Sequence, residues 1–214
     1  VIGGHYDTVI DCPGANDNGT GVAATLALAR AFANKKTART LRFVAFVNEE
    51  PPYFQTPEMG SYVYAQKCRE RNENVVAMLS LETIGYYTDA PQSQQYPLPL
   101  AAFFPPVGNF IAFVSNRRSR KLLKEVAKSF RKHTEFPFVD GAFPSMITGV
   151  GWSDQWAFWQ HGYPGMMVTD TAPFRYLYYH TPDDTPDKIH FEHFTRLVTG
   201  LEGMLEDLVA ISKD

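Results

Sequence analysis

The chain has few of the features that identify several large classes of protein. Only two cysteines, Cys12 and Cys68, occur among 214 residues, which excludes a framework of disulfides. No apolar run approaches the roughly 20 residues that a membrane-spanning helix needs. The 20 basic residues against 23 acidic ones give a formal charge of −3, which argues against a nucleic-acid surface built on bulk positive charge. A mildly acidic chain remains, long enough for one self-sufficient core.

The sequence also lacks an initiating methionine. It opens instead on the strand-like run Val1-Ile2-Gly3-Gly4. We therefore expect a fragment of a longer chain, with any targeting segment lying upstream. The length predicts a single domain over residues 1–214. Two stretches, 51–58 and about 86–108, are rich in proline and show no period, so both are expected to be long loops, the second a loop insertion.

Short apolar runs alternate with amphipathic stretches along the chain, which predicts an α/β fold with a mostly parallel central sheet flanked by helices. In the first predicted helix the stripe Val22, Leu26 and Ala29 is expected to be buried, and Ser153 is a candidate helix N-cap. In the last predicted helix the expected buried stripe runs from Phe191 through Leu201 to Leu208. The predicted strands cover residues 1–4, 41–47, 75–81, 109–114 and 165–169, and the predicted helices cover 22–32, 122–130, 153–162 and 191–208.

Acidic residues and histidines follow several of the predicted strands, where an open parallel sheet binds its ligands. The first run is followed by His5-Tyr6-Asp7, the next by Asn48-Glu49-Glu50, and the third by Glu82. His180 follows the pair Tyr178-Tyr179, which is interpreted as a further strand end, and Asp17 lies in a glycine-rich turn before the first helix. Each pattern alone is typical of a solvated surface or a turn, but their shared placement at strand ends favours a metal site.

This set of side chains is what two zinc ions need. Zinc binds imidazole and carboxylate groups, and two ions about 3.5–4 Å apart require a bridging carboxylate. Asp17 is the expected bridge, with His5 and Glu82 on one ion and Glu50 and His180 on the other. Two further acids have separate roles: Glu49 is left free as a general base, and Asp7 is placed to hold the second imidazole nitrogen of His5.

Six motifs follow one another along the chain: Gly3-Gly4-His5-Tyr6-Asp7, Gly14-Ala15-Asn16-Asp17-Asn18-Gly19-Thr20-Gly21, Phe46-Val47-Asn48-Glu49-Glu50, Leu81-Glu82-Thr83-Ile84-Gly85, Ser153-Asp154 and Tyr179-His180-Thr181-Pro182-Asp183-Asp184-Thr185. In this order they resemble peptidase family M28, whose members include zinc-dependent bacterial aminopeptidases and which is related to glutaminyl cyclases. The resemblance implies an α/β/α sandwich, here without its N-terminal elements, and the same five ligands, bridge and base. It further implies that Asp154 lies close to the metal ligands, and it favours a periplasmic or secreted location.

The leading hypothesis is a zinc aminopeptidase with two ions per chain, acting on peptides that have a free N-terminus. One alternative is an enzyme like the glutaminyl cyclases, which uses a single zinc ion and cyclises N-terminal glutamine. Another is a binding module without catalysis, although both candidate metal sites and the base, Glu49, are present. The sequence does not separate an aminopeptidase from a carboxypeptidase or dipeptidase, and it leaves side-chain preference and oligomeric state open.

Overall fold

The computed structural model describes residues 1–97 and 100–210, in which six strands form one sheet. The strand order is β2-β1-β3-β6-β4-β5, and the first four of these run parallel to one another. β4 runs antiparallel to β6 and parallel to β5. The strands are β1 (Ile2–His5), β2 (Phe43–Phe46), β3 (Met78–Glu82), β4 (Ile111–Asn116), β5 (Phe138–Phe143) and β6 (Gly165–Thr169).

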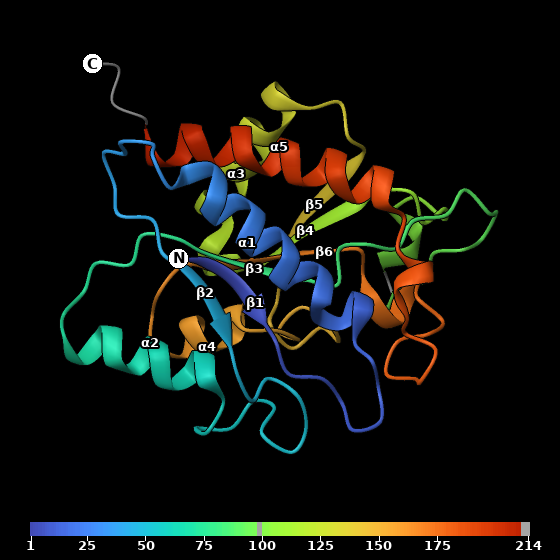
Figure 1. Cartoon of the computed structure of the whole chain (residues 1–214), viewed down its shortest axis with the longest axis horizontal. Coiled ribbons are helices and arrows are strands. Elements are labelled where there is room, and N and C mark those ends of the chain that lie inside the picture. Colours follow the sequence, from blue (N-terminus) through green and yellow to red (C-terminus); the bar gives the residue numbers. More distant parts are fainter. Residues whose placement is uncertain (98–99, 211–214) are drawn as a thin grey trace.

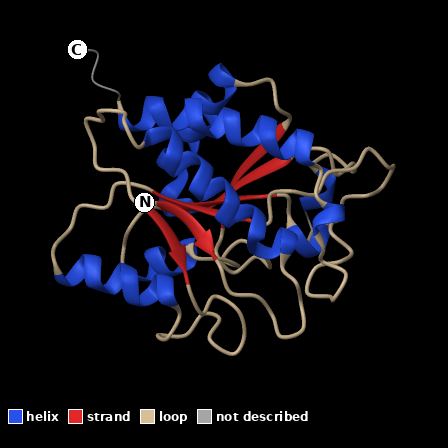
Figure 2. Ribbon diagram, in the orientation of Figure 1, coloured by secondary structure: helices blue, strands red, loops and turns tan. Residues whose placement is uncertain are grey.

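Helices cover both faces of this sheet, which gives the three-layer α/β/α arrangement (Figures 1 and 2). In Figure 1, α1, α3 and α5 lie above the sheet and α2 and α4 below it. Within the described part of the chain no helix is long and apolar enough to cross a membrane. The helices are α1 (Gly21–Phe32), α2 (Gly60–Glu70), α3 (Arg120–His133), α4 (Gln155–Gln160) and α5 (Phe191–Val209), with the short helical turns η1 (Ala15–Thr20), η2 (Leu100–Ala102), η3 (Arg117–Ser119), η4 (Ala172–Phe174) and η5 (Pro186–Lys188).

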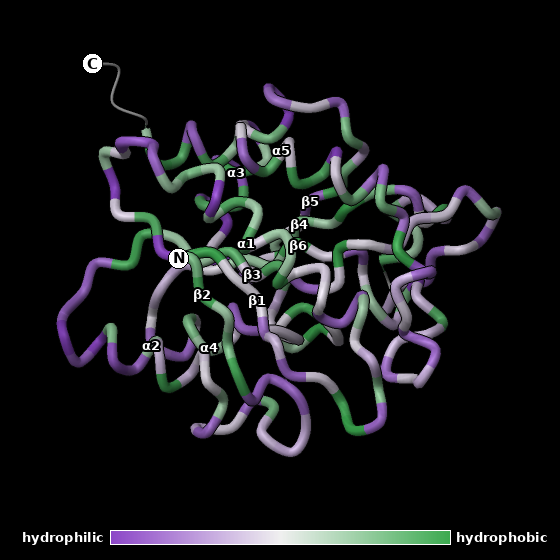
Figure 3. The backbone as a smooth tube through the Cα atoms, viewed as in Figure 1, coloured by the Kyte–Doolittle hydropathy of each residue, from purple (hydrophilic) through white to green (hydrophobic). Residues whose placement is uncertain are grey.

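Each face of the sheet has its own apolar core. The larger core packs β-strand residues such as Phe113 and Leu81 against Leu28 of α1, Phe130 of α3 and Leu201 of α5. The smaller core includes Phe46, Ala65, Met78 and Phe158 and lies between the sheet and α2 and α4. Figure 3 shows hydrophobic stretches running through the central strands, while hydrophilic stretches lie on the outer turns. Burial of both faces explains the near-continuous apolar runs of the central strands.

The predicted fold class is confirmed, and five of the six strands fall where apolar runs predicted them. Two details of the helices are wrong. In α1, Leu26 is 65% exposed and the buried face is Ala24, Thr25 and Leu28 instead. In α5, Phe191 is 62% exposed and burial begins at Leu197. Both helices carry apolar residues on more than one face, and packing against neighbouring elements decides which of these residues face the core.

The order of the strands places a ligand crevice beside β1. The chain crosses from β1 to β2 through α1 and then from β2 back past β1 to β3 through α2, on the other face of the sheet (Figure 1). The chain therefore moves first to one side of β1 and then to the other, and open α/β sheets bind ligands at such a reversal, beyond the carboxyl ends of the strands. His5 ends β1 and Glu82 ends β3, so two candidate ligands lie at this point.

Candidate metal centre

Two of the candidate ligands are carried on neighbouring strands in the centre of the sheet. β1 pairs with β3, and His5 and Glu82 are the last residues of these strands. Gly4 allows the site to be this compact, because a Cβ there would lie 2.4 Å from the carbonyl oxygen of Leu81 and 2.8 Å from Nδ2 of Asn18. A substitution at Gly4 would therefore displace the strand end that carries His5.

The double glutamate follows β2 through a tight turn. Asn48 has φ of 59°, a left-handed conformation that asparagine adopts more readily than most residues. Glu49 and Glu50 follow this residue, and both are buried. The loop is tied to the first strand because the backbone N–H of Glu50 donates to Oδ2 of Asp7 at 3.0 Å.

Asp17 lies in η1 between two asparagines that anchor its loop to the end of β3. Asn18 donates through Nδ2 to the carbonyl oxygen of Leu81 at 2.8 Å and accepts from the backbone N–H of Thr83 at 3.1 Å. Asn16 accepts from the backbone N–H of Gly85 at 2.8 Å. These buried hydrogen bonds hold the Asp17 loop and the Glu82 strand end in one arrangement.

The two carboxylate oxygens of Asp17 face two different histidines. Oδ1 lies 3.3 Å from Nε2 of His5, which is 3.2 Å from Oε2 of Glu82. Oδ2 lies 3.0 Å from Nε2 of His180, which is 3.3 Å from Oε1 of Glu50. Two groups of possible ligands, His5-Asp17-Glu82 and Asp17-Glu50-His180, therefore share Asp17 and no other residue.

The chemistry of these groups fits metal ions. Nε2 of His5, both oxygens of Asp17, Oε1 of Glu50 and Nε2 of His180 are buried and have no hydrogen-bond partner. Buried polar atoms without a partner are costly, so their convergence indicates that something else satisfies them. Ligands about 2.0–2.1 Å from a tetrahedral zinc ion lie about 3.3 Å from one another. The separations of 3.0–3.3 Å between these side chains match that spacing.

Glu49 lies beside these two groups and forms a third possible ligand group with His5 and Glu50. Its Oε2 is 3.8 Å from Nε2 of His5, and its side chain is buried. Burial raises the pKa of Glu49 well above its ordinary value, and the nearby carboxylates of Glu82 and Asp154 raise it further. A carboxylate with a raised pKa is suited to taking up and releasing a proton near neutral pH.

The other acids and histidines of the site have shifted pKa values in a consistent pattern. Burial raises the pKa of Glu82 to about 7. Burial alone would lower the pKa of both histidines, but their carboxylate neighbours outweigh it: that of His5 is well above its usual range and that of His180 is about 9. Burial opposes ionisation of Asp17, yet His180 and His5 lower its pKa to about 2. Without a cation, the site therefore retains protons.

Asp7 and Asp154 support this group in different ways. Nδ1 of His5 lies 3.0 Å from the backbone carbonyl oxygen of Asp7 and 3.7 Å from its carboxylate, so the closer acceptor is the backbone rather than the side chain. Asp154 is fully buried, and its carboxylate oxygens have no hydrogen-bond partner. Burial raises the pKa of Asp154 to about 6.

Two expectations about local structure are corrected. His180 does not follow a strand: it lies on a turn after η4 with φ of 57°, and the Tyr179 ring stacks on it with centroids 3.8 Å apart. Ser153 is not the N-cap of α4, which is Asp154, and neither residue makes a capping hydrogen bond there. Oγ of Ser153 instead donates to Oε2 of Glu82 at 2.7 Å. The sequence feature that could have pointed to this contact is the place of Ser153 beside Asp154 in the motif Ser153-Asp154.

An apolar pocket adjoins the metal centre. It lies against the sheet face formed by β4, β5 and β6 and is closed by segments of the 86–108 and 148–174 regions. The pocket holds about 100 Å³ of free space, and Glu82 and Tyr179 belong to its wall. Trp152 and Phe174 supply aromatic surface to its wall. Its wall also includes Phe104, Val114, Val139 and Met167.

The fold and the arrangement of these acids and histidines are matched by one family of peptidases. The model of "Peptidase family M28" matches residues 1–201, so the chain belongs to that family. The chain is 36% identical over 214 residues to "Uncharacterized protein YfbL" of Escherichia coli (strain K12), covering 96% of this chain and 65% of that protein. Over 96 residues it is 38% identical to a "Probable zinc metalloprotease" of Pyricularia oryzae (strain 70-15), covering 41% of this chain and 18% of that protein.

Solved structures show the same architecture. The aminopeptidase from Aneurinibacillus sp. strain AM-1 superposes with a TM-score of 0.69 at 26% identity, covering 96% of this chain and 42% of that one. The Fimbriiglobus ruber glutaminyl cyclase superposes with a TM-score of 0.68 at 21% identity, covering 99% of this chain and 70% of that one, which shows a common fold. The chain thus spans just under two thirds of YfbL and less than half of the Aneurinibacillus enzyme.

Proposed function

We propose that the chain is the catalytic part of an aminopeptidase that uses two zinc ions. The observation that carries this proposal is the arrangement around Asp17, whose two oxygens face His5 and His180 separately. His5 and Glu82 would hold one ion with Asp17, and Glu50 and His180 would hold the other. A site for a single ion would not need two complete ligand groups that share one carboxylate.

Zinc supplies Lewis acidity, because it lowers the pKa of coordinated water to about 7 and polarises a carbonyl group. Residues of the chain itself then transfer the proton. Glu49, buried beside His5, takes the proton of the attacking water and later delivers it to the amine that leaves. Asp154, buried next to this group, would keep Glu49 basic through the repulsion between two acids.

The apolar pocket beside Glu82 is suited to the side chain of the first residue of a peptide. With that side chain in the pocket, the free α-amine would lie near the carboxylates of the site, which attract an ammonium group. This placement would confine hydrolysis to the N-terminal peptide bond. It also predicts that large apolar first residues are preferred, because most of the pocket wall is aliphatic or aromatic.

The proposal is tested by comparing leucine p-nitroanilide with its N-acetylated form on the zinc-loaded protein. An aminopeptidase cleaves the first and not the second, since acetylation removes the charged amine. Equal cleavage of both substrates would contradict the exopeptidase assignment. The same protein should be tested on peptides with N-terminal glutamine, because cyclisation without hydrolysis would favour the alternative of a glutaminyl-cyclase-like enzyme, whose fold this chain shares.

A further inference from the structure

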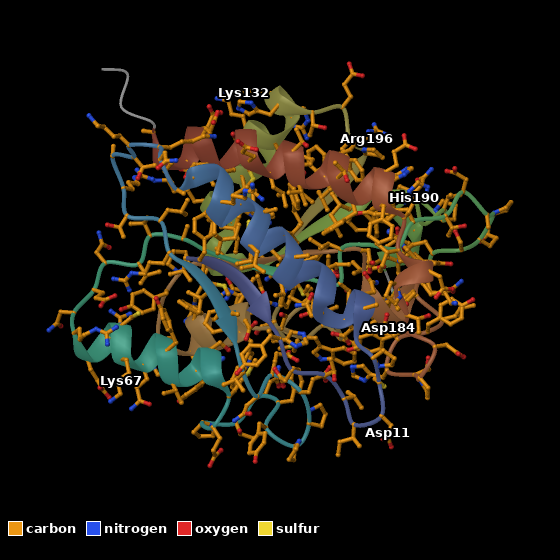
Figure 4. All side chains as sticks on the ribbon, in the orientation of Figure 1. Asp11, Lys67, Lys132, Asp184, His190 and Arg196 are labelled. Atoms are coloured by element: carbon orange, nitrogen blue, oxygen red, sulfur yellow. The ribbon has the colours of Figure 1, made fainter. Side chains whose placement is uncertain are left out.

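Asp184 belongs to the loop between η4 and η5, and it has no place in the proposed chemistry. Its side chain is buried and only 1% of the residue is exposed. Figure 4 labels it beside the N-terminal end of α1, the helix that directly follows the Asp17 loop. A buried carboxylate needs compensating donors, so the partners of Asp184 indicate what it does.

The carboxylate of Asp184 holds the backbone of the Asp17 loop. Oδ1 accepts from the N–H of Asn16 at 2.8 Å, and Oδ2 accepts from the N–H of Asp17 itself at 3.0 Å. The carbonyl oxygen of Asp184 accepts from the N–H of Ala15 at 3.1 Å. Three successive backbone N–H groups of η1 are therefore bound by one residue that lies 167 positions away from Asp17.

The same residue is fixed on the side of His180. Tyr176 donates its hydroxyl hydrogen to Oδ1 of Asp184 at 2.7 Å, and the backbone N–H of Asp184 donates to the carbonyl oxygen of Thr181 at 3.1 Å. Thr181 directly follows His180, so the turn that carries His180 and the loop that carries Asp17 are joined through Asp184. The two loops have no strand in common, since Asp17 precedes α1 and His180 follows η4.

We propose that Asp184 is a positioning residue that sets the distance between Asp17 and His180 and thereby the affinity of the metal site they share. This inference rests on the proposed zinc function. The physical reason is that Oδ2 of Asp17 and Nε2 of His180, 3.0 Å apart, lie on two separate loops that Asp184 joins by hydrogen bonds. Partners of metal ligands commonly change metal affinity by about 10–100-fold when they are removed.

The test is Asp184→Asn, which keeps the shape of the side chain but replaces one acceptor oxygen with a donor. The control is Asp170→Asn, because Asp170 is equally buried and also accepts three hydrogen bonds, from Asn16 Nδ2, the Tyr86 N–H and the Ala172 N–H. Both variants are stripped of metal, their thermal stability is measured, and zinc is titrated in competition with a chromophoric chelator.

We expect Asp184→Asn to weaken at least one zinc dissociation constant by about 10-fold or more. Asp170→Asn should change the same zinc dissociation constant by no more than about threefold, even where it lowers the thermal stability by a comparable amount. Wild-type affinity in folded Asp184→Asn would overturn the inference, as would equal losses in the two variants. If Asp184→Asn does not fold, Tyr176→Phe decides: faster zinc release supports the inference and unchanged release overturns it. Wild-type protein that binds no zinc would overturn the proposed function as well.

Discussion

Glu49 is the residue on which the proposed chemistry depends most directly. It is buried and lies 3.8 Å from Nε2 of His5, whereas Glu82 and Asp17 lie at 3.2 and 3.3 Å from the same atom. Glu49 is therefore further from Nε2 of His5 than the two carboxylates that lie closest to that atom. In the proposed function Glu49 transfers a proton and is not one of the five metal ligands, so proton transfer and metal binding can be tested independently.

The variant Glu49→Gln should lower kcat for leucine p-nitroanilide by about 10²–10⁴-fold, because the amide cannot take up the proton of water. Zinc content should equal that of the wild type, since the five candidate ligands are unchanged. Steady-state kinetics and elemental analysis of the same preparation check both expectations. Turnover within a few fold of the wild type in a fully zinc-loaded variant would show that Glu49 is not the base.

At the scale of elements, the sequence was most informative where a strand is buried on both faces. The runs at 75–81 and 165–169 predicted β3 and β6, and the polar residues after the strands included His5, Glu49, Glu50 and Glu82, which the structure brings together. Asp17 was found from a glycine-rich turn, whereas His180 was found on the expectation that a strand ends at Tyr179, and the structure has no strand there. The order of the strands depends on long-range pairing, which no local pattern records.

β5 and α2 were missed for identifiable reasons. β5 is an edge strand that contains Asp140 and Gly141, two residue types depleted in strands. α2 buries only Ser61, Ala65 and Cys68, so its inward face has no large apolar stripe. The roles of Asn16, Asn18 and Asp184 were also missed, because hydrogen bonds between distant loops leave no periodic signal.

The apolar pocket against β4, β5 and β6 predicts which side chain is preferred at the first residue of a substrate. Val114→Phe should fill part of the 100 Å³ space and reduce kcat/KM for leucine p-nitroanilide by about 10-fold or more, while alanine p-nitroanilide changes much less. The control is Val63→Phe, since Val63 is 42% exposed on α2 and does not belong to the pocket wall. An equal loss for both substrates in Val114→Phe would argue against a side-chain pocket here.

At the scale of the whole molecule, the metal centre should link stability to pH. In the metal-free protein the folded-state pKa of Glu82 is raised from 4.5 to about 7 and that of His180 from 6.5 to about 9. A group with a raised folded-state pKa stabilises the fold below its unfolded value and loses that contribution as pH rises through the folded value. The stability of the metal-free protein should therefore fall as pH rises from about 5 to about 9, first through loss of the Glu82 contribution and then through loss of the His180 contribution.

We expect the melting temperature of chelator-treated protein to fall by about 5 °C or more between pH 5.5 and pH 8.5. Added zinc should restore it most strongly at the higher pH, because metal binding displaces the protons that the site otherwise retains. Thermal denaturation across this range, with and without zinc, measures the effect. A metal-free protein that becomes more stable as pH rises would contradict the arrangement of charges described here.

The most direct test of the account is the number of zinc ions bound per chain, measured by elemental analysis after saturation with zinc and removal of the excess. The arrangement around Asp17 predicts close to two ions per chain, together with hydrolysis of leucine p-nitroanilide. One ion per chain with cyclisation of N-terminal glutamine would contradict it and favour the glutaminyl-cyclase-like alternative. Protein that binds no zinc and has no activity would contradict the metallopeptidase function altogether.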